Sequence, residues 1–118
     1  MAIHFLTPDP ASLLKEFDAR IHQTEAEGKI TTWEKLEDGK HYTHKAADWK
    51  SKAYFKPSVG KDRLTFNIIR PKDKSVTVPV YGYYHGHLME TFLNHFDKKF
   101  TTSMTSALPE AGDDVTKK

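Results

Sequence analysis

The first apolar residues of the chain recur at the three- and four-residue steps of a helix. They are Leu13, Leu14, Phe17 and Ile21. Asp9 can cap the free amide groups at the start of this stripe, and Pro10 suits the first helical position because its missing N–H is not needed there. Gly28 is a natural stop. The pattern therefore predicts a first helix over residues 10–27.

The middle of the chain has the short, turn-bounded segments that are typical of strands. Residues 30–36 and 41–46 are expected to form a hairpin around an Asp-Gly turn. A second pair is expected over residues 52–56 and 63–70, joined by a turn at residues 57–60. Together these segments predict four strands.

A further alternating apolar face is formed by Val76, Val78 and Val80. It predicts a fifth strand, and Pro79 places this strand at an edge or a bulge because proline cannot donate to a ladder.

The strongest helical signal follows the aromatic run at residues 81–84. It consists of Leu88, Met89, Phe92, Leu93 and Phe96. This second helix is expected to end near residues 98–99, and residues 100–104 would form a short strand or an extended segment on the sheet. Residues 105–118 are polar and are predicted to be a disordered tail, so the single domain spans residues 1–104.

The order of these elements predicts an α+β fold with the sequence α-β-β-β-β-α. Each helix has one apolar stripe and the strands have one apolar face, so a two-layer sandwich is the economical arrangement. We expect an antiparallel sheet of four to five strands, with the N-terminal and the C-terminal helix packed on one face. The other face would be left at least partly toward solvent.

Charge changes this picture because it is sorted into blocks. Residues 1–38 contain four Lys or Arg and eight Asp or Glu, whereas residues 39–80 contain ten Lys or Arg and three Asp. Residues 81–118 are close to neutral. The formal net charge of +2 therefore hides a basic segment that coincides with the predicted strands, and this segment is the leading candidate for function.

Positive side chains beside aromatic rings suit an anionic partner, because they combine charge neutralisation with contact area. The same lysines would also be explained as turn residues or as charges that keep strand edges from pairing. An acidic protein and a nucleic acid are equally good partners, since no residue pattern reads bases. The predicted partner-binding residues are Tyr42, Trp49, Lys52, Tyr54, Lys56, Arg63, Arg70 and Lys72.

The alternative prediction is a small-molecule or metal site at the strand–helix junction over residues 81–90, where a histidine could also carry hydrolytic or transfer chemistry. Its glycines allow a close approach of the backbone to a ligand, and its tyrosines supply an apolar wall with a polar tip. The metal or ligand-binding residues would be His85, His87 and Glu90. These residues match no recognised zinc spacing, and the structural explanation is a turn whose histidines cap or pack.

Composition removes several classes of function. The chain has no cysteine, which excludes disulfides and thiolate sites and fits a reducing compartment. No apolar run approaches the roughly 20 residues of a membrane span, and the first residues do not resemble a signal peptide. No complete catalytic motif is present. We therefore expect a cytoplasmic, non-catalytic binding module without a cofactor or a membrane partner, and a homodimer is compatible with it.

Overall fold

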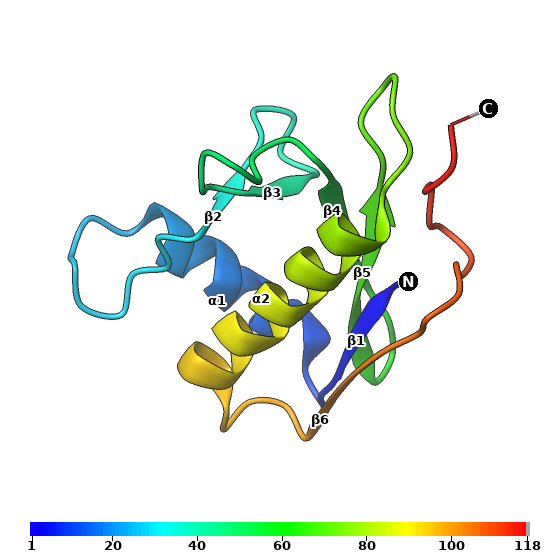
Figure 1. Ribbon diagram of the computed structural model, residues 1–118. Coiled ribbons are helices and arrows are strands. Elements are labelled where there is room, and N and C mark those ends of the chain that lie inside the picture. Colours follow the sequence, from blue (N-terminus) through cyan, green and yellow to red (C-terminus); the bar gives the residue numbers. More distant parts are fainter. Residues whose placement is uncertain (118) are drawn as a thin grey trace.

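One antiparallel sheet of six strands dominates the computed structural model, which describes residues 1–117. In chain order the elements are β1 (Ile3–Leu6), α1 (Pro10–His22), β2 (Trp33–Lys35), β3 (Tyr42–His44), β4 (Tyr54–Val59), β5 (Arg63–Ile69), α2 (Val78–Phe96) and β6 (Thr102–Thr105). The strand order is β2-β3-β4-β5-β1-β6. The first strand of the chain thus lies inside the sheet, between β5 and β6 (Figure 1).

The core lies between the two helices and one face of the sheet. Phe66 of β5 is fully buried, and its ring centroid lies 5.8 Å from that of Phe17 in α1 and 5.7 Å from that of Phe92 in α2. Phe92 also stacks on Phe5 of β1 at 4.0 Å. Because both helices reach the same inward side chain, they pack on one face of the sheet. The α+β class and the antiparallel sheet are confirmed.

The predicted strand count and element order are wrong at the start of the chain. The sheet has six strands rather than four or five, because Ile3–Leu6 form β1 ahead of α1. Ile3 and Phe5 are fully buried while His4 and Leu6 are partly exposed, which is the alternation of a strand. Four residues carry too little periodicity to predict a strand by themselves. At the other end, β6 overlaps residues 100–104, for which the sequence predicts a short strand or an extended segment, although it begins two residues later and ends one residue later.

The edge strand predicted over residues 76–80 is wrong, because α2 begins there. Thr77 is the N-cap, and its side-chain oxygen accepts a hydrogen bond from the Val80 N–H at 3.4 Å. Pro79 lies in the first turn, where its missing N–H costs nothing. The start signals of a helix outweigh the alternation of valines. Residues 81–90 therefore lie within α2 and form no strand–helix junction.

The first helix is shorter than predicted. It ends at His22 rather than near residue 27, with Gln23 as its C-cap. The Gln23 side chain donates hydrogen bonds to the carbonyls of Glu25 and Glu27, at 3.0 and 2.7 Å, and these close the loop that follows. Gly28 turns this loop with a φ of 75°, a conformation that favours glycine. The glycine thus turns the chain within the loop between α1 and β2, and it does not end the helix.

Both predicted hairpins are present. Trp33 pairs with His44 in the first of them. In the second, the turn lies later than residues 57–60, because Val59 pairs with Leu64 and Pro57 lies within β4. β3 pairs with β4 only at Tyr42 and Phe55. Pro57 therefore faces no paired residue of β3, and its missing N–H costs no hydrogen bond to that strand.

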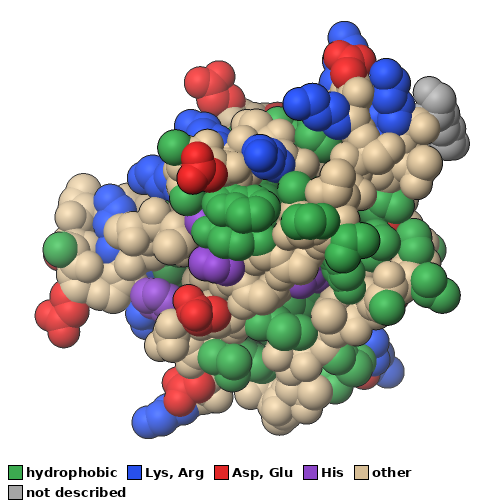
Figure 2. Space-filling view, viewed as in Figure 1, with side chains coloured by type: hydrophobic (Ala, Val, Ile, Leu, Met, Phe, Trp, Pro, Cys, Tyr) green, Lys and Arg blue, Asp and Glu red, His purple; other side chains and the backbone are tan. Residues whose placement is uncertain are grey.

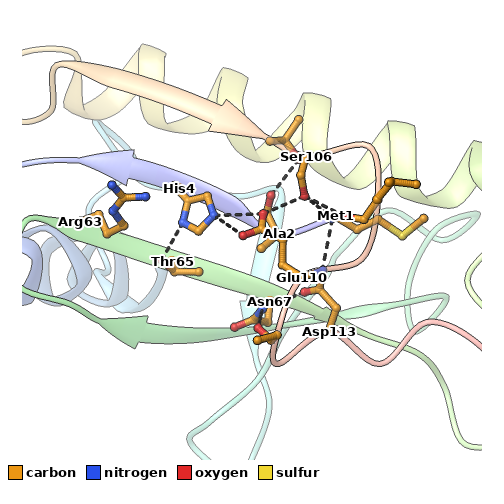
Figure 3. A network of polar contacts seen from close by, with 12 residues as sticks. Met1, Ala2, His4, Arg63, Thr65, Asn67, Ser106, Glu110 and Asp113 are labelled. Carbon is orange, nitrogen blue, oxygen red and sulfur yellow. Dashed lines mark hydrogen bonds and ion pairs between the residues drawn. The ribbon is translucent and has the colours of Figure 1, made fainter.

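Residues 106–117 run back along β1 and β5. His4 of β1 contacts Thr65 Oγ1 at 2.8 Å and Glu110 at 3.0 Å, and Ser106 donates to Glu110 at 2.7 Å (Figure 3). Further along, Asp114 pairs in parallel with β5. Composition predicts that residues 105–118 are disordered, and this stays a prediction. Lys118 lies outside the residues that the structure describes.

The expected lack of a membrane-spanning helix is confirmed for the described part of the chain. Neither α1 nor α2 combines the length with the apolar content that a crossing of the bilayer requires.

Candidate anion-binding site

A cavity of about 450 Å³ opens between two loops at one end of the sheet. One loop joins β3 to β4 and the other joins β5 to α2. Lys52 lines the cavity from the first loop, and Lys72 and Lys74 line it from the second. Asp73 is the one acid among the described lining residues. We call this space the lysine cavity. The loop before α2 stands at the top of Figures 1 and 2, where Lys and Arg atoms gather.

The charges of the lysine cavity are available to a ligand. Among residues 1–117, ion pairs form at other lysines, such as Lys50 with Glu34 at 3.0 Å, and none forms at the three cavity lysines. All three side chains are exposed, so an ion in solution can reach them. Three positive groups and one negative group facing one space attract an anion.

The N-terminus of α2 borders the lysine cavity but adds little to this attraction. Pro79 has no N–H, and the N–H of Val80 is taken by the Thr77 side chain. The Tyr81 N–H already donates to the Thr77 carbonyl at 2.9 Å. Most amides of the first turn are therefore unavailable to a ligand, and the attraction comes from the lysines.

Three aromatic rings are stacked beside the lysine cavity. Trp49, from the β3–β4 loop, lies parallel to Tyr83 of α2, with ring centroids 3.8 Å apart and planes at 9°. Tyr83 in turn stacks on His87 at 3.9 Å and 21°. Lys52 Nζ lies 5.7 Å from the centre of the Trp49 ring, so this lysine borders both the cavity and the rings. We call Trp49, Tyr83 and His87 the aromatic stack. Figure 2 shows hydrophobic and histidine side chains together below the loop that precedes α2.

Local sequence explains how the aromatic stack forms. Tyr83 and His87 are four residues apart, so they lie on one side of α2. Ser51 has a φ of 61°, a left-handed conformation that is uncommon for a residue other than glycine. Its N–H donates to Thr43 Oγ1 at 3.0 Å, which holds the turn in place. This turn brings Lys52 back beside Trp49.

A buried histidine supports the aromatic stack from below. His44 Nδ1 accepts a hydrogen bond from the Ala46 N–H at 3.1 Å, so the proton of its neutral ring is on Nε2. That nitrogen lies 3.4 Å from His87 Nδ1, to which it donates. Burial lowers the pKa of His44, and the neighbouring His87 lowers it further. A hydrogen bond therefore joins the two histidines. Because Nε2 of His44 carries the proton, that nitrogen has no lone pair with which to bind a metal.

These histidines make a prediction about acid stability. Burial is the main reason that the pKa values of His44 and His85 lie below the ordinary 6.5. At pH values between these lowered pKa values and 6.5, the unfolded chain binds more protons than the folded chain does. The free energy of unfolding therefore decreases as the pH falls from about 6.5 toward the pKa values of the folded chain. We expect the urea midpoint of unfolding to decrease from about pH 7.5 to about pH 5.5. A His85→Gln variant should show a shallower decrease, and a midpoint of the unmodified chain that does not change with pH over this range would contradict the prediction.

Three of the eight predicted partner-binding residues come together, namely Trp49, Lys52 and Lys72. Three others lie on the face of the sheet turned away from the helices. They are Tyr54, Lys56 and Arg63. Arg70, at the end of β5, is paired with Asp114 at 3.0 Å. The three lysines of the lysine cavity thus lie in loops at one end of the sheet, not on the strands.

Tyr42 is wrong as a source of exposed contact area. Its side chain is buried on the inward face, where its ring centroid lies 5.0 Å from that of Phe17. Its hydroxyl donates to the Asp18 carboxylate of α1. Burial and this carboxylate raise the pKa of Tyr42, so the phenol stays neutral. The residue ties β3 to α1 and is unavailable to a partner.

His85, His87 and Glu90 are not brought together as a metal site. No cluster of three His, Asp or Glu side chains suited to a metal occurs within residues 1–117. Because α2 already begins at Val78, His85 and His87 point roughly 200° apart around the helix. His85 is buried, with Nδ1 2.7 Å from the Tyr81 carbonyl, whereas His87 belongs to the aromatic stack.

A second cavity, of about 360 Å³, lies between the start of α1 and the end of α2. Its charged lining residues are Asp9, Glu16, Lys98 and Lys99. Glu16 and Lys99 form an ion pair at 2.6 Å. Because its charges balance, this cavity favours an ion of neither sign.

Sequence reasoning missed Lys74 and the stacking of Tyr83 and His87. Lys74 was available as part of the basic segment. The spacing of Tyr83 and His87 would have indicated a shared helix face if Pro79 had been interpreted as a first-turn proline. No local signal predicts the contact of Trp49 with Tyr83, because it joins two distant segments.

No family model, no curated protein and no solved structure matches this chain.

Proposed function

We propose that this chain is a non-catalytic binding module that holds an anionic partner, an acidic protein or a nucleic acid, at the lysine cavity. Lys52, Lys72 and Lys74 supply the attraction, and the aromatic stack supplies contact area. Lys56, which is exposed on the outer face of β4, adds long-range attraction. A cytoplasmic setting belongs to the same proposal, since the chain has no cysteine.

The convergence of three lysines on one cavity is the observation that supports this proposal most. Lys52 comes from one loop and the other two lysines from another loop, so only the folded chain brings their charges together. The described lining contains no histidine and a single carboxylate, so it lacks the acid and base pair of a hydrolytic site. Electrostatic binding therefore accounts for the cavity better than catalysis.

Reversing two cavity charges, with Lys52→Glu and Lys72→Glu combined, is expected to weaken binding of inorganic polyphosphate about tenfold or more at low salt. Each change replaces an attraction with a repulsion of similar size. Binding by the unmodified chain should itself fall steeply as salt is added, because exposed charges are screened. Fluorescence anisotropy of labelled polyphosphate measures both effects.

The matched control is Lys15→Glu combined with Lys98→Glu, which makes the same change in net charge at exposed positions away from the cavity. This control should bind polyphosphate with a much smaller loss. Equal losses in the two variants would mean that net charge and not the cavity decides binding. Affinity that does not respond to salt would refute the proposal outright.

A further inference from the structure

The aromatic stack offers a flat platform next to the lysine cavity. Tyr83 covers one face of Trp49 at 3.8 Å, and Trp49 remains partly exposed. Lys52 Nζ, which lines the cavity, lies over the same ring at 5.7 Å from its centroid, so this flexible side chain must swing aside for a ligand ring to stack there. A ligand with a negative group and an aromatic ring a short distance apart could therefore bind the cavity lysines with the first and stack on Trp49 with the second.

The platform is held rigidly although Trp49 lies in a loop. The Trp49 carbonyl accepts hydrogen bonds from the Tyr84 hydroxyl and from the Lys52 N–H, the latter at 3.2 Å. The Trp49 N–H donates to the Ala46 carbonyl at 2.9 Å. The rings of His44 and Tyr83 pack in a T-shaped arrangement, with their centroids 4.9 Å apart. A ring that is already fixed loses little conformational entropy when a ligand stacks on it.

We infer that the anionic partner is single-stranded nucleic acid, with a phosphate held by the lysines of the cavity and a base stacked on Trp49. This inference rests on the proposed function and names its partner. Carboxylates of an acidic protein would satisfy the lysines equally well, but they have no use for a parallel aromatic platform. Every nucleic acid base has a flat face, so stacking requires no particular sequence. The bases of a duplex are already stacked on each other, which favours a single strand.

Trp49 itself reports on this contact. The chain has two tryptophans, and Trp33 is buried in the core at 1% exposure. In a Trp33→Phe background, all tryptophan fluorescence comes from Trp49. Addition of an oligothymidine of about ten nucleotides should quench this fluorescence, because a stacked base contacts the indole ring. Inorganic polyphosphate, which has no bases, should bind at the lysines with little quenching.

Substitution separates the base contact from the charge contact. Trp49→Ala is expected to weaken binding of labelled oligothymidine about tenfold, the typical effect of losing one stacked base. The same change should leave polyphosphate affinity nearly unaltered. Tyr54→Ala is the matched control, since it removes a partly exposed aromatic ring from β4 that lies outside the cavity lining. Trp49→Phe keeps a ring at the platform and should retain most of the affinity, which tests the inference even if the alanine variant unfolds.

The outcomes distinguish failure of the single-stranded nucleic acid inference from failure of the proposed anion-binding function. Loss of oligothymidine binding in Trp49→Ala with unchanged polyphosphate binding supports single-stranded nucleic acid. Equal binding of both polyanions, without quenching and without an effect of Trp49→Ala, overturns the inference while the lysine cavity stays an anion site. Preference for polyglutamate over both overturns it in favour of an acidic protein. Binding of none of the three overturns the proposed function as well.

Discussion

Phe92→Ala is expected to lower the free energy of unfolding by about 3–5 kcal/mol. The Phe92 side chain is fully buried at the meeting point of both helices and the sheet. Its ring stacks on Phe5 at 4.0 Å and 15°, and lies 5.1 Å from Phe17 and 5.7 Å from Phe66. Truncation removes these contacts and leaves a cavity that surrounding rings cannot fill without leaving their own positions.

Urea unfolding followed by circular dichroism measures this loss. Domains of this size have a total stability of about 5–15 kcal/mol, so the variant should unfold at a much lower urea concentration. Leu93→Ala, at the next position of α2, is the matched control because that side chain is 53% exposed. It should change stability by no more than about 0.5 kcal/mol. Similar urea midpoints for the two variants would contradict the packing described for α2.

Tyr84→Phe is expected to destabilise the chain by about 2 kcal/mol and to loosen the loop that carries Trp49. The buried Tyr84 hydroxyl donates to the Trp49 carbonyl and lies 3.1 Å from Thr43 Oγ1. Burial raises the pKa of Tyr84, so the phenol keeps its proton and remains a donor. Phenylalanine would fill the same space but leave the Trp49 carbonyl with one donor fewer.

Amide hydrogen exchange measures the local part of this effect. Exchange at residues 49–52 should become faster in Tyr84→Phe, because local opening of the loop costs less free energy. Tyr81→Phe is the matched control on the same helix, since the Tyr81 hydroxyl donates to the Ser106 carbonyl at 2.6 Å and has no contact with the loop. Its effect should appear near Ser106. Equal exchange at residues 49–52 in both variants would show that Tyr84 does not fix the platform.

The link between Tyr84 and Trp49 connects stability with the proposed function. A looser loop would place Trp49 and Lys52 less accurately, so Tyr84→Phe should also weaken oligothymidine binding although it touches no ligand. The hydroxyl of Tyr84 acts here as a positioning group. At saturating oligonucleotide the amides of residues 49–52 in Tyr84→Phe should exchange slowly again, because the bound ligand supplies the free energy that orders the loop.

The basic segment illustrates how far charge patterning leads. That its positive side chains meet an anionic partner stays a prediction, but two of the residues it selected, Lys52 and Lys72, line the lysine cavity. It placed the site on the strand face, however, where Arg63 pairs with its neighbour Asp62 at 3.4 Å. Linear charge cannot show which lysines remain unpaired, because the acids that pair with them come from anywhere in the chain.

Local pattern determined the elements whose cause is local. The stripe from Leu13 to Ile21 determined the buried face of α1, and the Asp-Gly turn set the pairing of Trp33 with His44, because helix periodicity and turn geometry act over a few residues. Tertiary structure alone decided that Ile3–Leu6 enter the sheet between β5 and β6, which supply the partners that four residues lack. It also decided the candidate site. The lysine cavity and the aromatic stack join loops and a helix that are separated in sequence, and only the packing of α2 against the sheet brings Tyr83 to Trp49.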